Sequence, residues 1–166
     1  MNTDDMLTRS WIIRGGRVDE RLALEDLQRS ASLVYDDYRQ QLLDNPDVIE
    51  LPRAQLADGH VRVAEADGRL LGFAVVLPRD GWFELDGLFV TPDQWRRGIG
   101  RALIDDACQR LAADGGGRLQ TVANPRAEGF YEKLGFRPVG MADTLFGPAR
   151  RMMLEIQAIS PSRGQS

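Results

Sequence analysis

The sequence predicts one globular domain of the mixed α/β class. Hydrophobic residues occupy 43% of its 166 positions, which is enough apolar material to build a single buried core. Their spacing switches several times between the alternation typical of strands and the three- and four-residue steps typical of helices, without any internal repeat. We therefore expect a single domain over residues 1–157, followed by a disordered tail at residues 158–166.

The first third of the chain predicts a strand followed by helices. Residues 11–14 form a short apolar strand. From Asp19 to about Gln41, apolar residues recur at three- and four-residue steps behind an acidic start, which predicts one amphipathic helix. Asn45-Pro46 ends this helix, and a short helix is expected after Pro52.

Three strands follow, and the third is predicted to be central. Val61 and Val63 alternate with polar neighbours as far as Asp67-Gly68, a dipeptide that signals a two-residue hairpin turn. Residues 69–77 form the return strand. Residues 82–90 are apolar on both faces, which is typical of a strand in the middle of a sheet.

The last part of the chain alternates helix and strand. An apolar stripe from Ile99 to Leu111 predicts a helix that begins at a glycine-containing loop and stops at the glycines of residues 115–117. Another helix is expected over residues 125–134, with Pro125 in its first turn. Three further strands complete a mixed sheet of about six to seven strands flanked by about four helices, at residues 118–123, 136–141 and 150–157.

The composition excludes several classes of partner. Lys and Arg total 21 against 25 Asp and Glu, and the net charge of −4 argues against broad binding to nucleic acid. No stretch approaches the roughly 18 apolar residues that a membrane span requires, and the first thirty residues contain no signal-peptide core. Cys108 and His60 are the only residues of their kinds, so we expect no disulfide and no metal site. A cytoplasmic protein follows, with Cys108 packing in a helix and His60 at a turn.

The segment TPDQWRRGIGRALI, residues 91–104, is the main candidate for ligand binding. It places Gly98 and Gly100 at the start of a helix, where unpaired amides and partial positive charge favour an anion. Three arginines surround the same turn and favour a pyrophosphate, namely Arg96, Arg97 and Arg101. The alternative is a loop whose arginines are only solvated. The spacing fits neither the Walker phosphate loop nor the dinucleotide fingerprint.

Two segments together resemble the GNAT superfamily of acetyl-CoA-dependent N-acetyltransferases. ELDGLFVTPDQWRRGIGRAL resembles the family's motif A, and NPRAEGFYEKLGF resembles its motif B. Trp95 stands where the family usually has Gln or Arg, and Arg96 stands where glycine is frequent. Since backbone amides mainly hold the ligand there, we expect these two substitutions to alter the details of binding more than the class of ligand that is bound. The order of elements matches from about residue 11 to 157, which implies a GNAT-like acyltransferase fold.

The resemblance implies a site for acetyl-CoA. Amides from Arg96 to Arg101 would hold the pyrophosphate, while the backbone of Leu88–Val90 would pair with the pantetheine arm. That arm would enter a V-shaped gap where the strands ending at Val90 and Ala123 splay apart, and Asn124 would touch it. The cofactor-binding residues expected are Leu88, Phe89, Val90, Trp95, Arg96, Arg97, Gly98, Ile99, Gly100, Arg101, Asn124 and Tyr131.

Direct transfer to an amine needs a base and an acid. Tyr131 matches the family's tyrosine and would protonate the departing thiolate, since a phenol of pKa about 10 can donate to a thiolate of pKa about 8.5. Glu84 matches a glutamate that accepts the amine proton in several members, and Asp86 is the alternative on the same strand face. An amide near Leu88 or Phe89 would hold the oxyanion. Without the resemblance, anchoring the core is the commoner role for Tyr131, and each carboxylate is equally a solvated strand end or a helix-capping contact.

We therefore predict an enzyme that transfers acetyl from acetyl-CoA to a primary amine of a small molecule or a peptide, through a direct ternary complex. A catalytically inactive coenzyme A binding or sensing module is the alternative, and a purely structural domain would bind no acetyl-CoA. Residues 19–58 and 141–149 are expected to shape the acceptor site. Their acidic and aromatic residues would favour a cationic amine, and the alternative is a solvent-exposed helix face: Tyr35, Asp36, Asp37, Tyr38, Asp44 and Asp47. A homodimer stays open, because dimers are common in the family.

Overall fold

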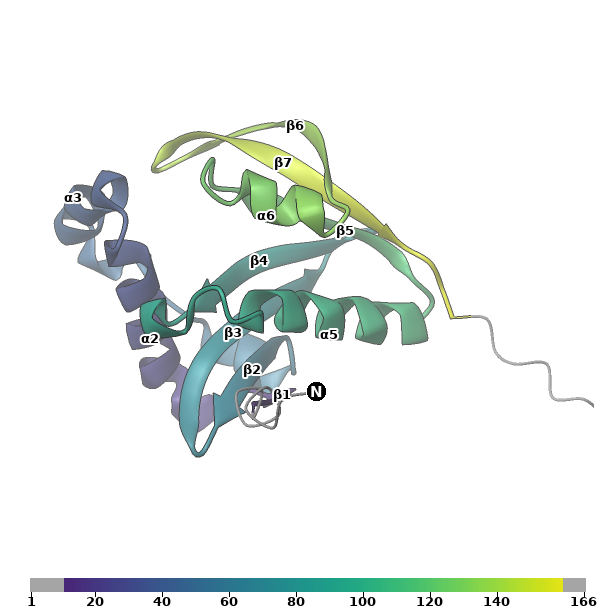
Figure 1. Ribbon diagram of the computed structural model, residues 1–166, viewed down its shortest axis with the longest axis horizontal. Coiled ribbons are helices and arrows are strands. Elements are labelled where there is room, and N and C mark those ends of the chain that lie inside the picture. The colour runs from purple at the N-terminus through teal and green to yellow at the C-terminus, as the bar shows by residue number, and fades with distance from the viewer. Residues whose placement is uncertain (1–10, 160–166) are drawn as a thin grey trace, which may run out of the picture. The chain divides into compact units, whose positions relative to one another are not determined.

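The computed structural model describes residues 11–159, and within them one mixed sheet forms the centre of the fold (Figure 1). Its strands are β1 (Ile12–Gly15), β2 (Val61–Ala66), β3 (Arg69–Pro78), β4 (Phe83–Val90), β5 (Gly117–Ala123), β6 (Arg137–Thr144) and β7 (Gly147–Ile156). Their hydrogen-bonded order is β1-β2-β3-β4-β5-β7-β6. The α-helices of the described chain are α2 (Arg21–Leu33), α3 (Asp36–Asp44), α4 (Arg53–Ala57), α5 (Ile99–Ala113) and α6 (Glu128–Lys133). The predicted mixed sheet is confirmed, and five helices stand where about four were expected.

The chain divides into two compact units. The first contains residues 11–75 and 87–103, and the second contains residues 76–86 and 104–159. The divisions fall inside β3, β4 and α5, so each of these elements contributes residues to both units.

The first unit is built on the β2–β3 hairpin that the sequence predicted. Asp67 and Gly68 both have positive φ, at 50° and 78°, which is the backbone of a type I′ turn. β1 and β3 each pair antiparallel with β2. Core side chains of this unit come from the hairpin and from one face of α2, as the helical spacing requires: Leu24, Leu27, Ala31, Val61, Val63 and Phe73.

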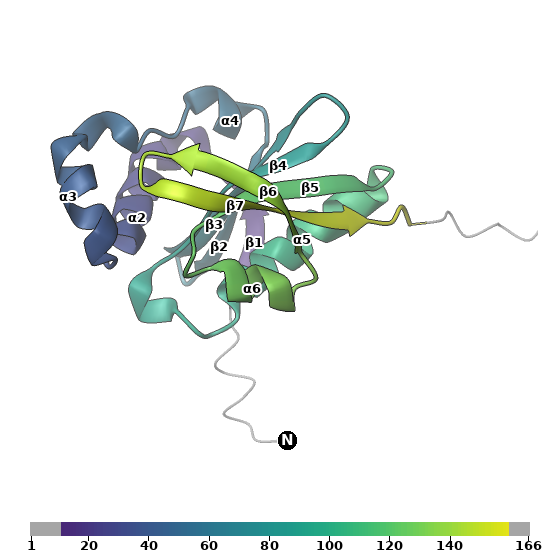
Figure 2. The same ribbon diagram turned by 90° about the horizontal axis from the view of Figure 1, so that it is seen from above.

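The single long helix expected over Asp19–Gln41 is wrong, because two helices occupy this segment (Figure 2). The chain leaves the helical conformation at Tyr35, whose ψ of 115° is extended. The buried stripe of α2 ends at Ala31, so continued helix would gain no further core contact on that face. Asp36 then begins α3, where an acidic residue suits the positive end of the helix dipole.

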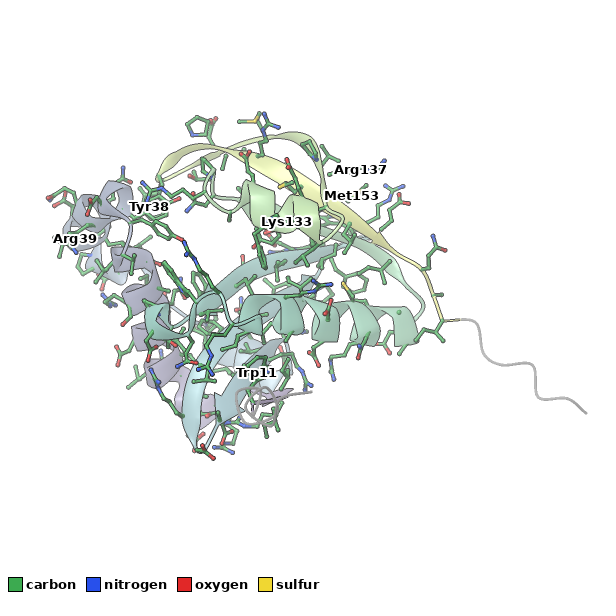
Figure 3. All side chains as sticks on the ribbon, viewed as in Figure 1. Trp11, Tyr38, Arg39, Lys133, Arg137 and Met153 are labelled. Atoms are coloured by element: carbon green, nitrogen blue, oxygen red, sulfur yellow. The ribbon has the colours of Figure 1, made fainter. Side chains whose placement is uncertain are left out.

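The second unit contains the long antiparallel hairpin β6–β7 with α6 beside it (Figure 1). The sequence placed a loop at residues 141–149, but only Leu145 and Phe146 lie outside the two strands, which corrects that expectation. The turn is closed by Thr144, whose hydroxyl donates to the Gly147 carbonyl at 2.6 Å and accepts from the Phe146 amide at 3.1 Å. Arg137 on β6 lies opposite Met153 on β7, as Figure 3 shows.

Helix α6 also begins later than predicted. The Asn124 side-chain carbonyl accepts the Arg126 amide at 2.9 Å, and the Asn124 main-chain carbonyl accepts the Ala127 amide at 2.8 Å. This Asx-type turn competes with helix over residues 124–127, so the helix begins at Glu128.

β4 and β5 run parallel, but their paired part is short. The register joins Phe83 to Leu119 and Glu84 to Gln120, whereas β5 continues to Ala123. On its other side β5 pairs with β7 along its whole length, from Gly117 to Ala123. The β4 side of β5 therefore loses its backbone partner after Gln120.

The ends of the chain limit two sequence predictions. Most of the tail predicted at residues 158–166 lies outside the described residues, although the Ile159 amide donates to the Ala112 carbonyl at 3.0 Å. None of the helices within residues 11–159 is long and apolar enough to cross a membrane. The prediction of a single domain over residues 1–157 stays a prediction.

Gly72 on β3 allows a close approach to the end of β4. A Cβ at this position would lie 2.7 Å from the Phe89 carbonyl oxygen, which is backbone and cannot turn away. We expect Gly72→Ala to lower the free energy of unfolding by about 1–3 kcal/mol, measured by urea denaturation. Gly140→Ala on β6 is the control, since its Cβ would meet no atom within 4 Å. Equal losses in both variants would contradict this account.

Candidate functional site

The predicted ligand loop lies at the start of α5 in the first unit. The Gly98 carbonyl accepts the Ala102 amide at 3.0 Å, so Gly98 stands at the N-cap of the helix. Its φ of 89° is left-handed, which an L side chain adopts only with strain. Ile99 is 1% exposed and anchors the first turn in the core. The loop therefore presents the first amides of α5 while a buried side chain fixes their direction.

Arg96 has a left-handed backbone, with φ of 67°. This conformation costs a non-glycine residue roughly 1–2 kcal/mol. It gives a physical reason for the glycine that is frequent at this position in the family that the sequence resembles. The arginine keeps the same backbone and adds a positive charge next to the α5 N-terminus.

Three arginines give the loop positive charge at the start of α5. Arg96, Arg97 and Arg101 are all exposed. Arg97 donates to the Gln94 side chain at 2.8 Å, while Asp93 pairs with Arg69 of β3 at 2.7 Å. That second pair lowers the pKa of Asp93, first through the hydrogen bond from Arg69. The one carboxylate of residues 91–101 is thus already paired, and the exposed arginines add positive charge beside the first amides of α5.

Trp95 links the loop to two other parts of the first unit. Its indole nitrogen donates to the Val90 carbonyl at 2.8 Å, at the last residue of β4. Its ring stacks on Tyr35, with centroids 5.8 Å apart and planes 23° apart, and Tyr35 in turn meets Tyr38 edge to face. Figure 3 shows Tyr38 on α3. The Trp95 side chain, for which a ligand role is expected, thus has two partners within the first unit, namely Val90 and Tyr35.

Two carboxylates lie on the part of β4 that belongs to the second unit. Glu84 accepts two hydrogen bonds from the Arg79 guanidinium, one of them at 2.8 Å from Nε. Asp86 lies two residues further, on the same face of the strand, and keeps contact with solvent. Partial burial first, and then the negative charge of Glu84, raise the pKa of Asp86, while Arg79 lowers it. Asp86 therefore binds a proton more readily than an ordinary aspartate.

Tyr131 is buried on α6 in the second unit, where it is 7% exposed. Its ring meets Phe130 and Phe136 edge to face, each with centroids 5.2 Å apart. Burial raises the pKa of Tyr131 to about 12, and a hydrogen bond with Thr121 lowers it by less. The phenol is thus neutral at physiological pH, with its hydroxyl held by a polar partner.

The structure adds two residues that the sequence did not single out. Arg79 reaches Glu84 because the turn between β3 and β4 is closed by a hydrogen bond from the Arg79 amide to the Trp82 carbonyl at 2.8 Å. Thr121 lies on β5, and its hydroxyl donates to the Leu85 carbonyl at 3.0 Å. A polar residue inside the apolar pattern of residues 117–123 was the only available signal for Thr121.

The predicted residues fall into both units. Leu88–Val90 and the loop of residues 95–101 belong to the first unit, whereas Glu84, Asn124 and Tyr131 belong to the second. Asn124 uses its side-chain carbonyl to accept the Arg126 amide, as described above. Within the second unit, Thr121 contacts both Tyr131 and the strand that carries Glu84.

The surroundings of Cys108 make its thiol less acidic. Cys108 on α5 is half-buried, and burial followed by the charge of Asp105 raises its thiol pKa, which disfavours the reactive thiolate. Within residues 11–159 there is no group of three or more His, Cys, Asp or Glu residues placed to hold a metal ion.

Comparison with known sequences gives two matches. The family model described as the acetyltransferase (GNAT) family matches residues 23–136. A 65-residue stretch is 46% identical to the peptidyl-lysine N-acetyltransferase YiaC of Escherichia coli (strain K12). That match covers 39% of this chain and 42% of the relative, so the chain spans less than half the length of that curated protein.

Solved structures with the same fold include two acetyltransferases. The PaiA N-acetyltransferase of Thermoplasma acidophilum, in complex with coenzyme A, matches with a TM-score of 0.71 and 20% identity, over 88% of this chain and 99% of its own. The ribosomal-protein-S18-alanine N-acetyltransferase of Escherichia coli matches with a TM-score of 0.67 and 19% identity, over 94% and 99%. At these identities the likeness concerns the fold alone.

The left-handed backbone at Arg96 can be tested by two substitutions. Arg96→Gly removes the strain and the side chain, whereas Arg96→Ala removes only the side chain. We expect the glycine variant to be more stable than the alanine variant by about 1 kcal/mol, measured by thermal and urea unfolding. At Arg97, which does not have positive φ, the same pair of substitutions should rank in the opposite order. Alanine as the more stable choice at both positions would rule out the strained conformation.

Proposed function

Because the chain belongs to the acetyltransferase (GNAT) family, we propose that it transfers an acetyl group from acetyl-CoA to a primary amine, by direct attack of the amine on the thioester. The observation that carries this proposal is the start of α5, where Gly98 caps the helix and exposed arginines surround its first amides. This combination of amide donors, dipole and guanidinium groups suits the pyrophosphate of coenzyme A.

The cofactor is held by backbone more than by side chains in this proposal. Amides of residues 96–101 bind the pyrophosphate, and the backbone of Leu88–Val90 pairs with the pantetheine arm. The Val90 carbonyl accepts a hydrogen bond from the Trp95 indole at 2.8 Å, which fixes the end of β4 to the loop. Asn124 contributes through the turn that precedes α6.

The reaction needs two proton transfers. The amine nitrogen attacks the thioester carbonyl and loses a proton to a base, while an amide near Leu88 or Phe89 stabilises the oxyanion. The carbon–sulfur bond then breaks, and Tyr131 gives its hydroxyl proton to the departing thiolate. A transfer from a phenol of pKa about 12 to a thiolate of pKa about 8.5 is unfavourable by about 5 kcal/mol. The phenolate therefore needs a stabilising partner.

Two carboxylates are candidates for the base. The family resemblance favours Glu84, but its carboxylate is already engaged in an ion pair with the Arg79 guanidinium. The electrostatics favour Asp86, because partial burial and Glu84 raise its pKa towards neutrality. We therefore propose that Asp86 accepts the proton of the amine, and that the negative charge of Glu84 raises the proton affinity of Asp86.

The acceptor that we propose first is the side-chain amine of a lysine in a peptide. The local 46% identity to a peptidyl-lysine N-acetyltransferase supports this choice. In the first unit, the segment of α3 and the following turn exposes Asp36, Asp44 and Asp47, which suits a cationic acceptor. A small-molecule amine remains the other acceptor class to be screened.

Acetyl-CoA binding can be tested by isothermal titration with a matched pair of variants. Gly98→Glu places a negative side chain beside the α5 amides, and Gly59→Glu introduces the same residue at another exposed glycine with positive φ and no atom within 4 Å. We expect Gly98→Glu to weaken the affinity at least about tenfold, and Gly59→Glu to leave it unchanged.

Turnover separates the proposed enzyme from a sensing module. Release of free thiol from acetyl-CoA with peptide lysines or other amines in a broad panel supports the transferase. Tight binding without thiol release would favour the sensing module instead. The absence of binding by the folded, unmodified chain would overturn both functions.

The pH dependence of kcat/KM distinguishes the two carboxylates. Activity falls as pH decreases through the pKa of the base. If Asp86 is the base, Glu84→Gln lowers the pKa of Asp86 and moves this acid limb to lower pH, whereas Arg79→Gln raises it and moves the limb to higher pH. Asp86→Asn should then lower kcat/KM by about 10²–10⁴-fold. A loss of that size in Glu84→Gln, with Asp86→Asn still active, would assign the base to Glu84.

A further inference from the structure

Thr121 replaces the backbone ladder at the point where β4 and β5 stop pairing. Their register ends with Glu84 opposite Gln120, and Leu85 and Thr121 are the next residues on the two strands. Within residues 11–159, Thr121 is the polar residue of the buried core, at 6% exposure. Its hydroxyl donates a hydrogen bond to the Leu85 carbonyl at 3.0 Å. This side-chain bond gives the carbonyl a partner just beyond the last backbone pair of β4 and β5.

The direction of this hydrogen bond determines the direction of the next one. A threonine hydroxyl has a single proton, and Thr121 gives it to Leu85. The phenol of Tyr131, which shares a hydrogen bond with Thr121, must therefore be the donor in that pair. The proton order is Tyr131 hydroxyl to Thr121 oxygen, then Thr121 hydroxyl to Leu85 carbonyl, all within the second unit.

We propose that Thr121 is a positioning residue that orients the hydroxyl of Tyr131 and then stabilises its phenolate during acetyl transfer. This inference rests on the proposed function, in which Tyr131 protonates the departing thiolate. The phenol proton moves from Tyr131 to sulfur, and the thiolate becomes a neutral thiol. Thr121 keeps its own proton and rotates about χ1, so that its O–H turns from Leu85 to the new phenolate oxygen.

The exchange of partners favours the reaction because of the charges involved. A hydrogen bond to a phenolate is charge-assisted and about twice as strong as one to a neutral carbonyl. Thr121 gains the stronger bond when the phenolate forms and gives up its bond to the Leu85 carbonyl in exchange, whereas in the resting state it holds the phenol in place. Valine has a similar shape and lacks this hydroxyl, while serine retains it, so the two substitutions separate shape from hydrogen bonding.

The kinetic experiment is a double-mutant cycle on the full chain. We expect Thr121→Val to lower kcat about tenfold or more with an unchanged KM for acetyl-CoA, and Thr121→Ser to recover most of that loss. In the Tyr131→Phe background, Thr121→Val should cause no further loss, because Thr121 acts through the phenol. An equal loss in both backgrounds would show a purely structural role and overturn the proposal.

A second readout does not depend on activity. The chain has three tyrosines, so fluorotyrosine labelling gives three ¹⁹F resonances, and Tyr131→Phe identifies the one that belongs to Tyr131. We expect the pKa of labelled Tyr131 to be higher in Thr121→Val than in Thr121→Ser or the unmodified chain, with Tyr35 and Tyr38 unchanged. An unchanged pKa in Thr121→Val would overturn the coupling, even if the chain shows no acetyl transfer.

The stability of Thr121→Val is followed in parallel, because that variant leaves the Leu85 carbonyl without its donor. Should it fail to fold, the resonance of Tyr131 in Thr121→Ser and in the unmodified chain decides the question. In both proteins, the hydroxyl proton of Tyr131 must exchange slowly with solvent and must lie close to the hydroxyl of residue 121. Rapid exchange of that proton in the unmodified chain would contradict the hydrogen-bonded order.

Discussion

The early end of the ladder between β4 and β5 is the constraint on which the rest of the second unit depends. A strand whose partner stops after two residue pairs leaves buried carbonyls and amides that need new partners. Thr121 supplies one of them by donating to Leu85, and this ties the phenol of Tyr131 to the same strand that carries Glu84 and Asp86. The interruption of the sheet thus brings an acid candidate and the strand of the base candidates into one hydrogen-bonded system.

The fold class and the family were predictable because their signals are local and strong. Alternating residues around Asp67-Gly68 predicted the β2–β3 hairpin, and the positive φ of both turn residues confirms it. The glycine loop followed by the stripe of Ile99 predicted a helix start, which the capping bond from Ala102 to Gly98 confirms. The family resemblance is confirmed by the match to the acetyltransferase (GNAT) family over residues 23–136.

The features that were missed depend on contacts between distant residues. The periodicity from Asp19 to Gln41 could not reveal the break at Tyr35, which accompanies the stacking of Tyr35 on Trp95, sixty residues away in the sequence. Glu84 was recognised as a carboxylate on a strand, but its charge is balanced by Arg79 across a turn. Tyr131 was assigned the pKa of an ordinary phenol, whereas its burial among Phe130 and Phe136 raises that pKa to about 12.

Trp95 shows how a departure from the family pattern can preserve a ligand site. The Gln or Arg that usually stands there can donate hydrogen bonds, and the indole N–H of Trp95 donates one to the Val90 carbonyl. The indole adds a flat face, which Tyr35 covers at the junction of α2 and α3. This junction lies in the segment expected to shape the acceptor site, and Trp95 immediately precedes the strained residue Arg96 of the loop that we propose for the cofactor. Through its stacking on Tyr35 and its hydrogen bond to Val90, Trp95 therefore connects that segment to the end of β4, whose backbone is proposed to hold the pantetheine arm.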